Sequence, residues 1–136
     1  MNKIVTGLAA AAVAAFVSTN AFAAGDVASG EKIVKTLCVA CHNAAKDAPA
    51  KVGPNLFGVV ARGPGKFEGF AYSDAFKAAA AKGFAWNDDT LDKYLTDATA
   101  FLHTTSGDST GVSKMTFKLA DPAKRADVIA FLDSLK

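Results

Sequence analysis

The sequence predicts an all-α fold, built from short helices that are joined by long loops. Three observations carry this prediction. Several segments repeat apolar residues at helical spacing, and most of them follow a residue that caps helix N-termini well. No segment alternates apolar and polar residues in the manner of a half-buried strand. The stretch 51–69 is rich in glycine and proline, which favours loops.

The chain begins with the pattern of a secretory signal peptide. A short positive start precedes an almost wholly apolar run over 4–17, and Ala21-Phe22-Ala23 places small residues at the two positions that signal peptidase inspects. We therefore predict that residues 1–23 are removed by cleavage after Ala23. The alternative is an uncleaved anchor, because no charged residue lies between Lys3 and Asp26.

Removal of this leader would leave residues 24–136, a length typical of one compact domain. The whole chain has 15 Lys and Arg against 13 Asp and Glu, and Lys3 is the only one of these in the leader. The remaining domain is nearly neutral. This argues against nucleic-acid binding, which requires a strong basic excess.

Four helices are expected in this domain, and most have a residue with a known capping preference at one end. They are 27–37, a helix from Ser73-Asp74 to Gly83, a helix that starts at Asn87-Asp88-Asp89, and a helix that starts at Asp121-Pro122 and carries the apolar stripe Val128, Phe131, Leu132 and Leu135. Gly30 would allow the first helix to cross close to the last.

Cys38-Val39-Ala40-Cys41-His42 is the motif that carries specific chemistry. The two thiols lie about one helical turn apart, so both can reach the vinyl groups on one edge of a porphyrin, while the histidine offers an imidazole to its iron. A thioredoxin-like dithiol would need a strand–helix context, and a zinc site would need two further soft ligands. The chain has only these two cysteines. We predict one haem c, bound through Cys38 and Cys41, with His42 as a metal ligand.

Met115 is the strongest candidate for the second axial ligand of the iron. It is the only methionine after the leader, and it lies in the polar stretch 113–117 rather than on an apolar helical stripe. A thioether ligand raises the reduction potential of haem. The alternative is His103, the only other histidine, which would give a bis-imidazole iron of lower potential. Its place near an expected helix end is more typical of a solvated side chain.

The segments after the leader together resemble the class I cytochromes c over essentially their whole length. Besides the haem motif, the segments that carry the resemblance are Gly53-Pro54-Asn55-Leu56-Phe57-Gly58 with Arg62, Gly69-Phe70-Ala71-Tyr72-Ser73-Asp74-Ala75, Gly83-Phe84-Ala85-Trp86, Tyr94-Leu95, Lys114-Met115-Thr116-Phe117 and Phe131-Leu132. The signal peptide and the extended loop 104–112 are most similar to the periplasmic carriers of the cytochrome c2 branch.

The resemblance implies a role for each matching position. His42 and Met115 would be the axial ligands, and the Pro54 carbonyl would accept the Nδ1 proton of His42. The other implied cofactor-binding residues are Arg62, Tyr72 and Trp86 around a buried propionate, Tyr94 near the methionine sulfur, and Phe117 over the haem face. A buried carboxylate does need a cation and hydrogen-bond donors. Without the resemblance, Trp86, Tyr94 and Phe117 would be interpreted as core side chains.

Three positions depart from the family pattern. No proline follows the helix that carries Tyr94, and this predicts a looser loop around Met115. Phe76 stands where a polar residue is common, and Leu37 stands where a lysine often precedes the first cysteine. The family lysines that remain around the haem edge are Lys51 and Lys114, with Lys118 close by. Electrostatic steering towards an acidic partner should therefore be weak.

The resemblance implies a one-electron carrier, not an enzyme, that shuttles electrons between periplasmic redox partners in a respiratory or photosynthetic chain. Its implied donor is a cytochrome bc1-type complex, and its acceptor an oxidase, a reductase, a peroxidase or a reaction centre. The protein is expected to act as a monomer. One alternative is a gas-binding sensor or a weak peroxidase, if Met115 leaves the iron easily. Another is a haem domain that works only when docked permanently to a larger complex.

Overall fold

The structure is a computed structural model that describes residues 24–136. The predicted signal peptide lies outside these residues, so its cleavage stays a prediction. The elements in chain order are α1 (Val27–Ile33), a π-helix η1 (Val34–Cys38), α2 (Val59–Arg62), α3 (Asp74–Ala80), α4 (Asp88–Thr96), α5 (Ala98–Ser106) and α6 (Pro122–Ser134). No strand occurs between residues 24 and 136, and this confirms the all-α prediction.

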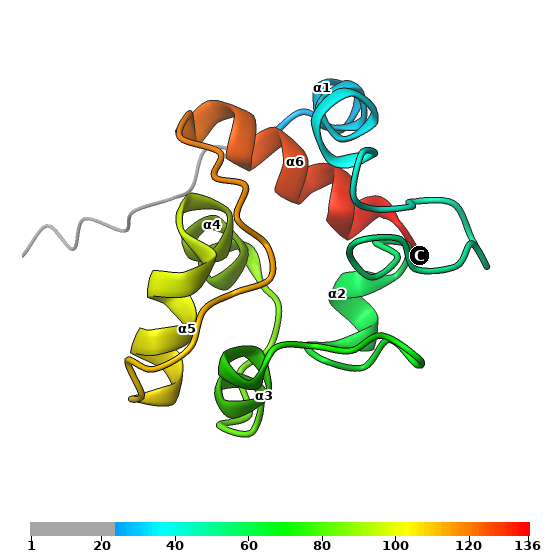
Figure 1. Cartoon of the computed structure of the whole chain (residues 1–136). Coiled ribbons are helices and arrows are strands. Elements are labelled where there is room, and N and C mark those ends of the chain that lie inside the picture. The colour runs from blue at the N-terminus through cyan, green and yellow to red at the C-terminus, as the bar shows by residue number, and fades with distance from the viewer. Residues whose placement is uncertain (1–23) are drawn as a thin grey trace, which may run out of the picture.

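Helix α6 is the element around which the others pack. It contacts α1, α4 and α2, while α5 packs against both α3 and α4 (Figure 1). Long irregular segments connect these helices, above all those over 39–58 and 107–121. None of the helices within 24–136 is long and apolar enough to cross a bilayer.

Gly30 allows α1 and α6 to cross at very close range, as the sequence predicts. A Cβ atom on Gly30 would lie 1.9 Å from the carbonyl oxygen of Asp127, closer than any side chain can approach. Just before the helix, the Asp26 backbone N–H donates to the Asp127 carboxylate at 2.7 Å. The start of the described chain is therefore fixed to the middle of α6.

The first predicted helix is two elements, because the backbone widens into a π-helix at Val34. In this wider turn the Val39 N–H donates to the Val34 carbonyl at 3.0 Å. Val34 and Gly30 are buried, but Val27 and Leu37 are each 45% exposed. The apolar stripe expected over 27–37 is therefore only partly buried, and its end belongs to the cavity described below.

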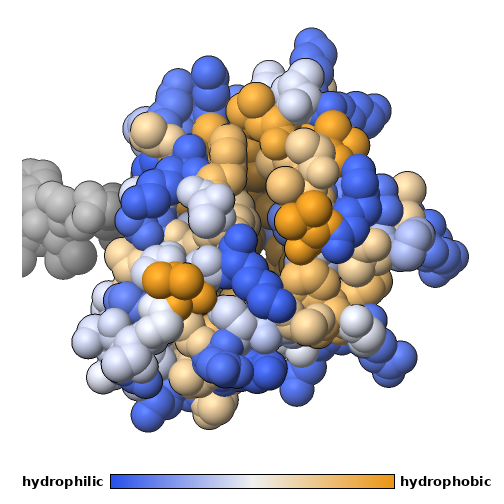
Figure 2. All heavy atoms as spheres, in the orientation of Figure 1, coloured by the Kyte–Doolittle hydropathy of each residue, from blue (hydrophilic) through white to orange (hydrophobic). Residues whose placement is uncertain are grey.

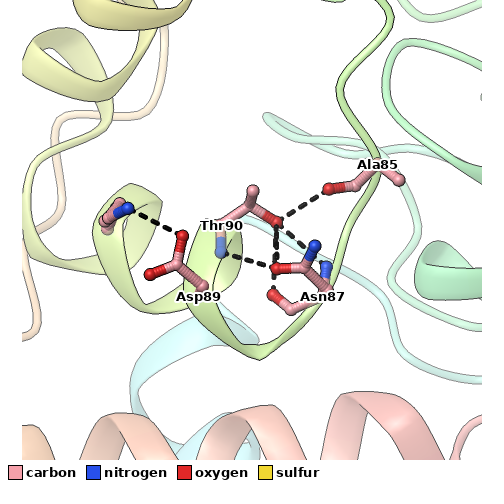
Figure 3. A network of polar contacts seen from close by, with 5 residues as sticks. Ala85, Asn87, Asp89 and Thr90 are labelled. Atoms are coloured by element: carbon pink, nitrogen blue, oxygen red, sulfur yellow. Dashed lines mark hydrogen bonds and ion pairs between the residues drawn. The ribbon is translucent and has the colours of Figure 1, made fainter. Parts of the chain in front are cut away.

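The start of α4 has a complete capping box (Figure 3). The Asn87 side chain accepts from the Thr90 N–H at 2.9 Å, and the Thr90 hydroxyl accepts from the Asn87 N–H at 2.9 Å. The same hydroxyl donates to the Ala85 carbonyl at 2.8 Å. One turn into the helix, Asp89 pairs with Lys93 at 2.7 Å. These contacts confirm the predicted helix start and fix the backbone on both sides of Trp86.

Two short helices differ from the sequence expectation. Helix α2 lies within the stretch 51–69 that was expected to be loop. Helix α5 follows α4 after a single extended residue, Asp97, whose side chain accepts from the Ala100 N–H at 3.0 Å and so caps the new helix. His103 lies in the last turn of α5, which confirms its expected place near a helix end. A one-residue break with an N-cap is difficult to distinguish from a continuous helix by periodicity.

Aromatic side chains from α3, α4, α5 and the segment just before α4 form one part of the core. Phe76, Trp86, Tyr94 and Phe101 lie with neighbouring ring centroids 5.1–6.3 Å apart. Such tilted and edge-to-face contacts are favourable beyond the area that they bury. This cluster forms one wall of the cavity that contains the predicted site residues.

Candidate cofactor-binding site

A cavity of about 420 Å³ lies between the cysteine motif and the segment that carries Met115. The residues lining it include Cys38, Cys41, His42, Trp86, Tyr94 and Met115. Figure 2 shows a hollow in this face of the molecule, framed largely by apolar side chains. A mostly apolar cavity of several hundred cubic ångströms, with few polar groups pointing into it, is typical of a cofactor site.

The two cysteines are brought to the same wall by one tight turn after η1. The N–H groups of Cys41 and His42 both donate to the Cys38 carbonyl, at 3.0 and 2.9 Å. Cys38 is partly buried and Cys41 is exposed. Burial raises the pKa of the Cys38 thiol, and the nearby Cys41 raises it further. Both cysteines belong to the cavity lining, as thioether attachment to one porphyrin edge requires.

His42 is held by its backbone neighbours in the orientation of a metal ligand. Its Nδ1 lies 2.7 Å from the Pro54 carbonyl oxygen. Because a carbonyl can only accept, Nδ1 carries the proton and Nε2 is left with a free lone pair. Burial lowers the pKa of His42, although the hydrogen bond to Pro54 opposes this. The ring is thus kept neutral, the form that binds iron.

Gly53 provides the space that the His42 ring occupies. A Cβ at this position would lie 2.3 Å from Cε1 of His42 and 2.7 Å from its Nδ1. No larger residue fits unless the imidazole moves. Sequence reasoning recognised Gly53 only as part of a motif, because a steric role becomes visible only when the ring is in place.

Met115 is positioned from the opposite side by a chain of polar contacts. Its N–H donates to the Ser113 hydroxyl at 3.0 Å, and the Ser113 N–H donates to the Thr99 hydroxyl at 3.0 Å. The Tyr94 hydroxyl lies 3.5 Å from the same Ser113 oxygen. Burial raises the pKa of Tyr94, so its hydroxyl stays protonated. Sequence reasoning missed Ser113, since a serine in a polar loop gives no sign that it is 4% exposed.

His103, the alternative ligand, lies away from the cavity. Its Nε2 is 2.8 Å from the Gly111 carbonyl oxygen, and its side chain is not among those that line the site. This contact ties α5 to the start of the segment that leads to Met115. The geometry therefore favours Met115 over His103 as the candidate axial ligand.

Of the three residues predicted around a propionate, Tyr72 and Trp86 line the cavity, whereas Arg62 does not and lines a separate cavity instead. Arg62 donates through Nη1 to the Phe57 carbonyl at 2.8 Å and through Nη2 to the Asn55 carbonyl at 2.6 Å. Its Nε is the one buried side-chain N or O atom within 24–136 that has no hydrogen-bond partner. An unpaired donor on a partly buried cation fits a nearby carboxylate.

Phe117 is 38% exposed at the mouth of the cavity, where a ring could cover a flat cofactor.

Asn55 is the other residue that sequence reasoning missed. It is 2% exposed, its amide donates to the Ala45 and Ala48 carbonyls, and its Oδ1 accepts from the Phe57 N–H. This side chain fixes the loop that follows Pro54.

No group of three or more His, Cys, Asp or Glu side chains within 24–136 could hold a bare metal ion. Iron bound by a single imidazole and a single thioether would need its remaining ligands from a porphyrin. The cysteine pair, the oriented imidazole, the thioether and the unpaired Arg62 donor all fit a haem that is attached covalently. Fold and site together define a small all-α protein built to enclose one haem.

Comparisons with known proteins agree with this class. The family model for cytochrome c matches residues 27–136. The chain is 56% identical over 112 residues to cytochrome c-550 of Novispirillum itersonii, which covers 82% of this chain and 100% of that protein. It is 45% identical over 113 residues to cytochrome c2 of Pararhodospirillum photometricum, which covers 83% of this chain and 100% of the relative. The chain belongs to the cytochrome c family.

Solved structures place it more narrowly. The structure of cytochrome c2 from Rhodospirillum centenum superposes with a TM-score of 0.76 at 39% identity, covering 82% of this chain and 98% of the other. Ferric cytochrome c-550 from Paracoccus versutus gives 0.72 at 41% identity, covering 82% and 98%. The protein is a class I c-type cytochrome of the c2 branch, which confirms the predicted resemblance and the single covalent haem c.

Its function follows from this membership. The protein is an electron carrier and not an enzyme, as predicted, and it exchanges electrons with other redox proteins. The alternative of a gas-binding sensor or a weak peroxidase has no support among these relatives.

Proposed function

We propose that Cys38 and Cys41 form the two thioether bonds, that His42 and Met115 are the axial ligands, and that Pro54, Arg62, Tyr72, Trp86, Tyr94 and Phe117 complete the haem site. The observation that carries this proposal is the placement of His42 and Met115 on the lining of one cavity, with the second histidine outside it. The bound haem supplies one-electron exchange between ferrous and ferric iron.

The protein supplies orientation, burial and exclusion of other ligands. Pro54 keeps the His42 proton on Nδ1, so that Nε2 faces the iron position. Ser113 holds the backbone of Met115, which keeps the thioether available at the same position. With both axial positions filled, no substrate can bind the metal. A thioether ligand and an apolar wall both favour the ferrous state, so we expect a high reduction potential.

For partners, we propose a cytochrome bc1-type donor and an oxidase, a reductase, a peroxidase or a reaction centre as acceptor. Docking should be brief and weakly steered. Of the three family lysines, Lys118 pairs with the Asp97 carboxylate, which offsets its charge. Lys51 and Lys114 donate to the carbonyls of Val39 and Ala71 and keep theirs. A bimolecular electron-transfer rate that falls steeply with ionic strength would contradict this weak steering.

We propose a periplasmic location, reached after cleavage behind Ala23. Support comes from the leader pattern of residues 1–23 and from the need to attach haem c after secretion in bacteria. The intact mass of the purified holoprotein tests this directly, since it should equal residues 24–136 plus one haem. A mass that retains the leader would favour the anchored alternative.

Optical spectra of the holoprotein in both redox states test the ligation. We expect a far-red sulfur-to-iron charge-transfer band in the ferric protein and no change when carbon monoxide is added to the ferrous protein. A His103→Ala variant is the matched control, and its band should be unchanged. Loss of the band in this variant, or ready binding of carbon monoxide by the native protein, would contradict Met115 ligation.

A further inference from the structure

Arg125 is the only charged residue among the buried residues of 24–136, with 9% of its surface exposed. It lies on α6, and its side chain is not part of the cavity lining. A buried guanidinium is unfavourable unless its donors are paired. Its three hydrogen bonds therefore indicate which parts of the molecule it joins.

The Arg125 guanidinium connects α6 to α4 and to the segment that follows Met115. Its Nε donates to the Asp92 carboxylate at 2.6 Å, and its Nη1 donates to the carbonyls of Leu119 and Ala120, each at 2.9 Å. Asp92 and Arg125 have side-chain exposures of 19% and 11%, so solvent screens this pair little. The Asp92 carboxylate orients the planar Arg125 guanidinium towards the Leu119 and Ala120 carbonyls.

These two carbonyls lie at the C-terminal end of the irregular segment between α5 and α6. The segment has no helix or strand of its own over residues 107–121. A backbone contact also holds this end, because the Leu119 N–H donates to the Leu95 carbonyl at 2.8 Å. At the other side of Met115 the backbone is held by Ser113. Met115 therefore lies between two stretches of backbone that side chains hold in place, and Arg125 holds one of these stretches.

The ion pair between Lys118 and Asp97 cannot replace the contact that Arg125 makes with this end of the segment. Lys118 pairs with Asp97 at 2.5 Å, but its side chain is 59% exposed. Exposed pairs contribute little to stability, whereas removing one partner of a buried pair leaves an uncompensated charge and unpaired acceptors.

We propose that Arg125, oriented by Asp92, is a positioning residue that holds Met115 at the iron by clamping the carbonyls of Leu119 and Ala120. The inference rests on the proposed ligation by His42 and Met115. It predicts that loss of the clamp increases the fraction of molecules in which Met115 has left the iron, while the covalent haem and His42 stay in place.

Imidazole binding to the ferric holoprotein measures that fraction. Exogenous imidazole competes with Met115, so its apparent Kd falls in proportion as the open form becomes more populated. In Arg125→Gln, loss of charge-assisted hydrogen bonds should increase the open form and tighten imidazole binding by about tenfold. Asp92→Asn should give a smaller change in the same direction, and Arg125→Lys should recover part of the native affinity.

Two control variants separate positioning from general stability. Lys93→Gln removes the exposed pair with Asp89 on the same helix as Asp92, and it should leave imidazole binding unchanged. Ile129→Ala removes a buried side chain of α6 that does not line the cavity. It should lower the free energy of unfolding without a comparable change in imidazole affinity.

Equal imidazole affinities in Arg125→Gln, Asp92→Asn and the native protein would overturn the inference. So would an effect of Ile129→Ala as large as that of Arg125→Gln. Failure of the proposed ligation has a different signature, because the native protein itself would then lack the sulfur-to-iron band.

Discussion

The two candidate ligands face the same cavity, but the protein holds them in different ways. His42 is fixed by its own backbone turn, by the Pro54 carbonyl and by the space at Gly53, all within 16 residues of Cys38 along the chain. Met115 is fixed by Ser113, which in turn binds Thr99, and by Arg125 through a carbonyl four residues away.

This difference indicates which of the two candidate ligands is displaced more easily. On the His42 side, steric fit and one short hydrogen bond allow little movement. On the Met115 side, several side chains from α4, α5 and α6 hold an irregular segment, and each can be lost separately. We therefore expect changes near Met115 to open the iron in graded steps and changes near His42 to act in an all-or-none manner.

The largest effect is expected from Gly53→Ala. The new methyl group would lie 2.3 Å from Cε1 of His42, so the ring or the loop must move. Overpacking of this kind should destabilise the fold by about 3 kcal/mol and impair haem attachment. Holoprotein yield and denaturant unfolding measure both. Val112→Ala, 66% exposed and outside the cavity lining, is the control and should behave as native.

Met115→Ala should leave the fold and the haem in place but alter the iron. Without the thioether, the far-red band should disappear, carbon monoxide should bind the ferrous protein, and the potential should fall by on the order of 0.1 V, within the about 0.8 V range that axial ligands span. Visible spectroscopy and a redox titration check this. An unchanged potential would mean that another residue is the native ligand.

Ser113→Ala should weaken the hold on Met115 and leave the surroundings of His42 unchanged. It removes the acceptor of the Met115 N–H at a site that is 4% exposed. An unpaired buried donor should cost about 1–2 kcal/mol of Met115 coordination. The far-red band should then be lost at a lower denaturant concentration than in the native protein. Ser106→Ala, at the C-terminal end of α5, removes an exposed hydroxyl that also accepts a backbone N–H two residues on, from Asp108, and it should show no such shift.

Asp97→Asn should have the smallest effect and should appear only in the pH dependence. Hydrogen bonds from Ala100 and Lys118 lower the pKa of Asp97 in the folded protein. Its contribution is therefore fully present above the pKa of the unfolded chain and is lost as the pH falls through the lower folded-state value. Asparagine can still cap α5, so stability should differ from native at neutral pH and converge with it in acid. A constant difference at all pH values would show that the cap matters more than the charge.

The same contrast explains how much of the molecule could be predicted from the sequence. The His42 side depends on neighbours in the chain, so Cys38, Cys41, His42 and the Pro54 contact could be proposed from a motif and a resemblance. Helix starts at Ser73, Asn87 and Asp121 were equally local and are confirmed. Helix α5 was missed, because a one-residue break gives almost no signal in the periodicity.

The Met115 side could be predicted only in part. Met115 itself was identifiable as the one methionine left after the leader, but its anchors come from residues far away in the chain. Nothing local indicates that Ser113 is buried, or that Arg125 faces inward from α6. The missing proline predicts a looser loop, and this stays a prediction; what the sequence did not indicate is the set of side-chain contacts along the loop. Long-range polar contacts of this kind need the tertiary fold to be seen.

The most direct test follows the ferric holoprotein through a denaturant titration with two signals. The far-red band reports Met115 on the iron, and far-UV circular dichroism reports the helices. We expect the far-red band to disappear at a clearly lower denaturant concentration than the helical signal, because the segment around Met115 opens before the rest of the protein unfolds. Coincident loss of both signals would contradict it, and would mean that Met115 is held as firmly as His42.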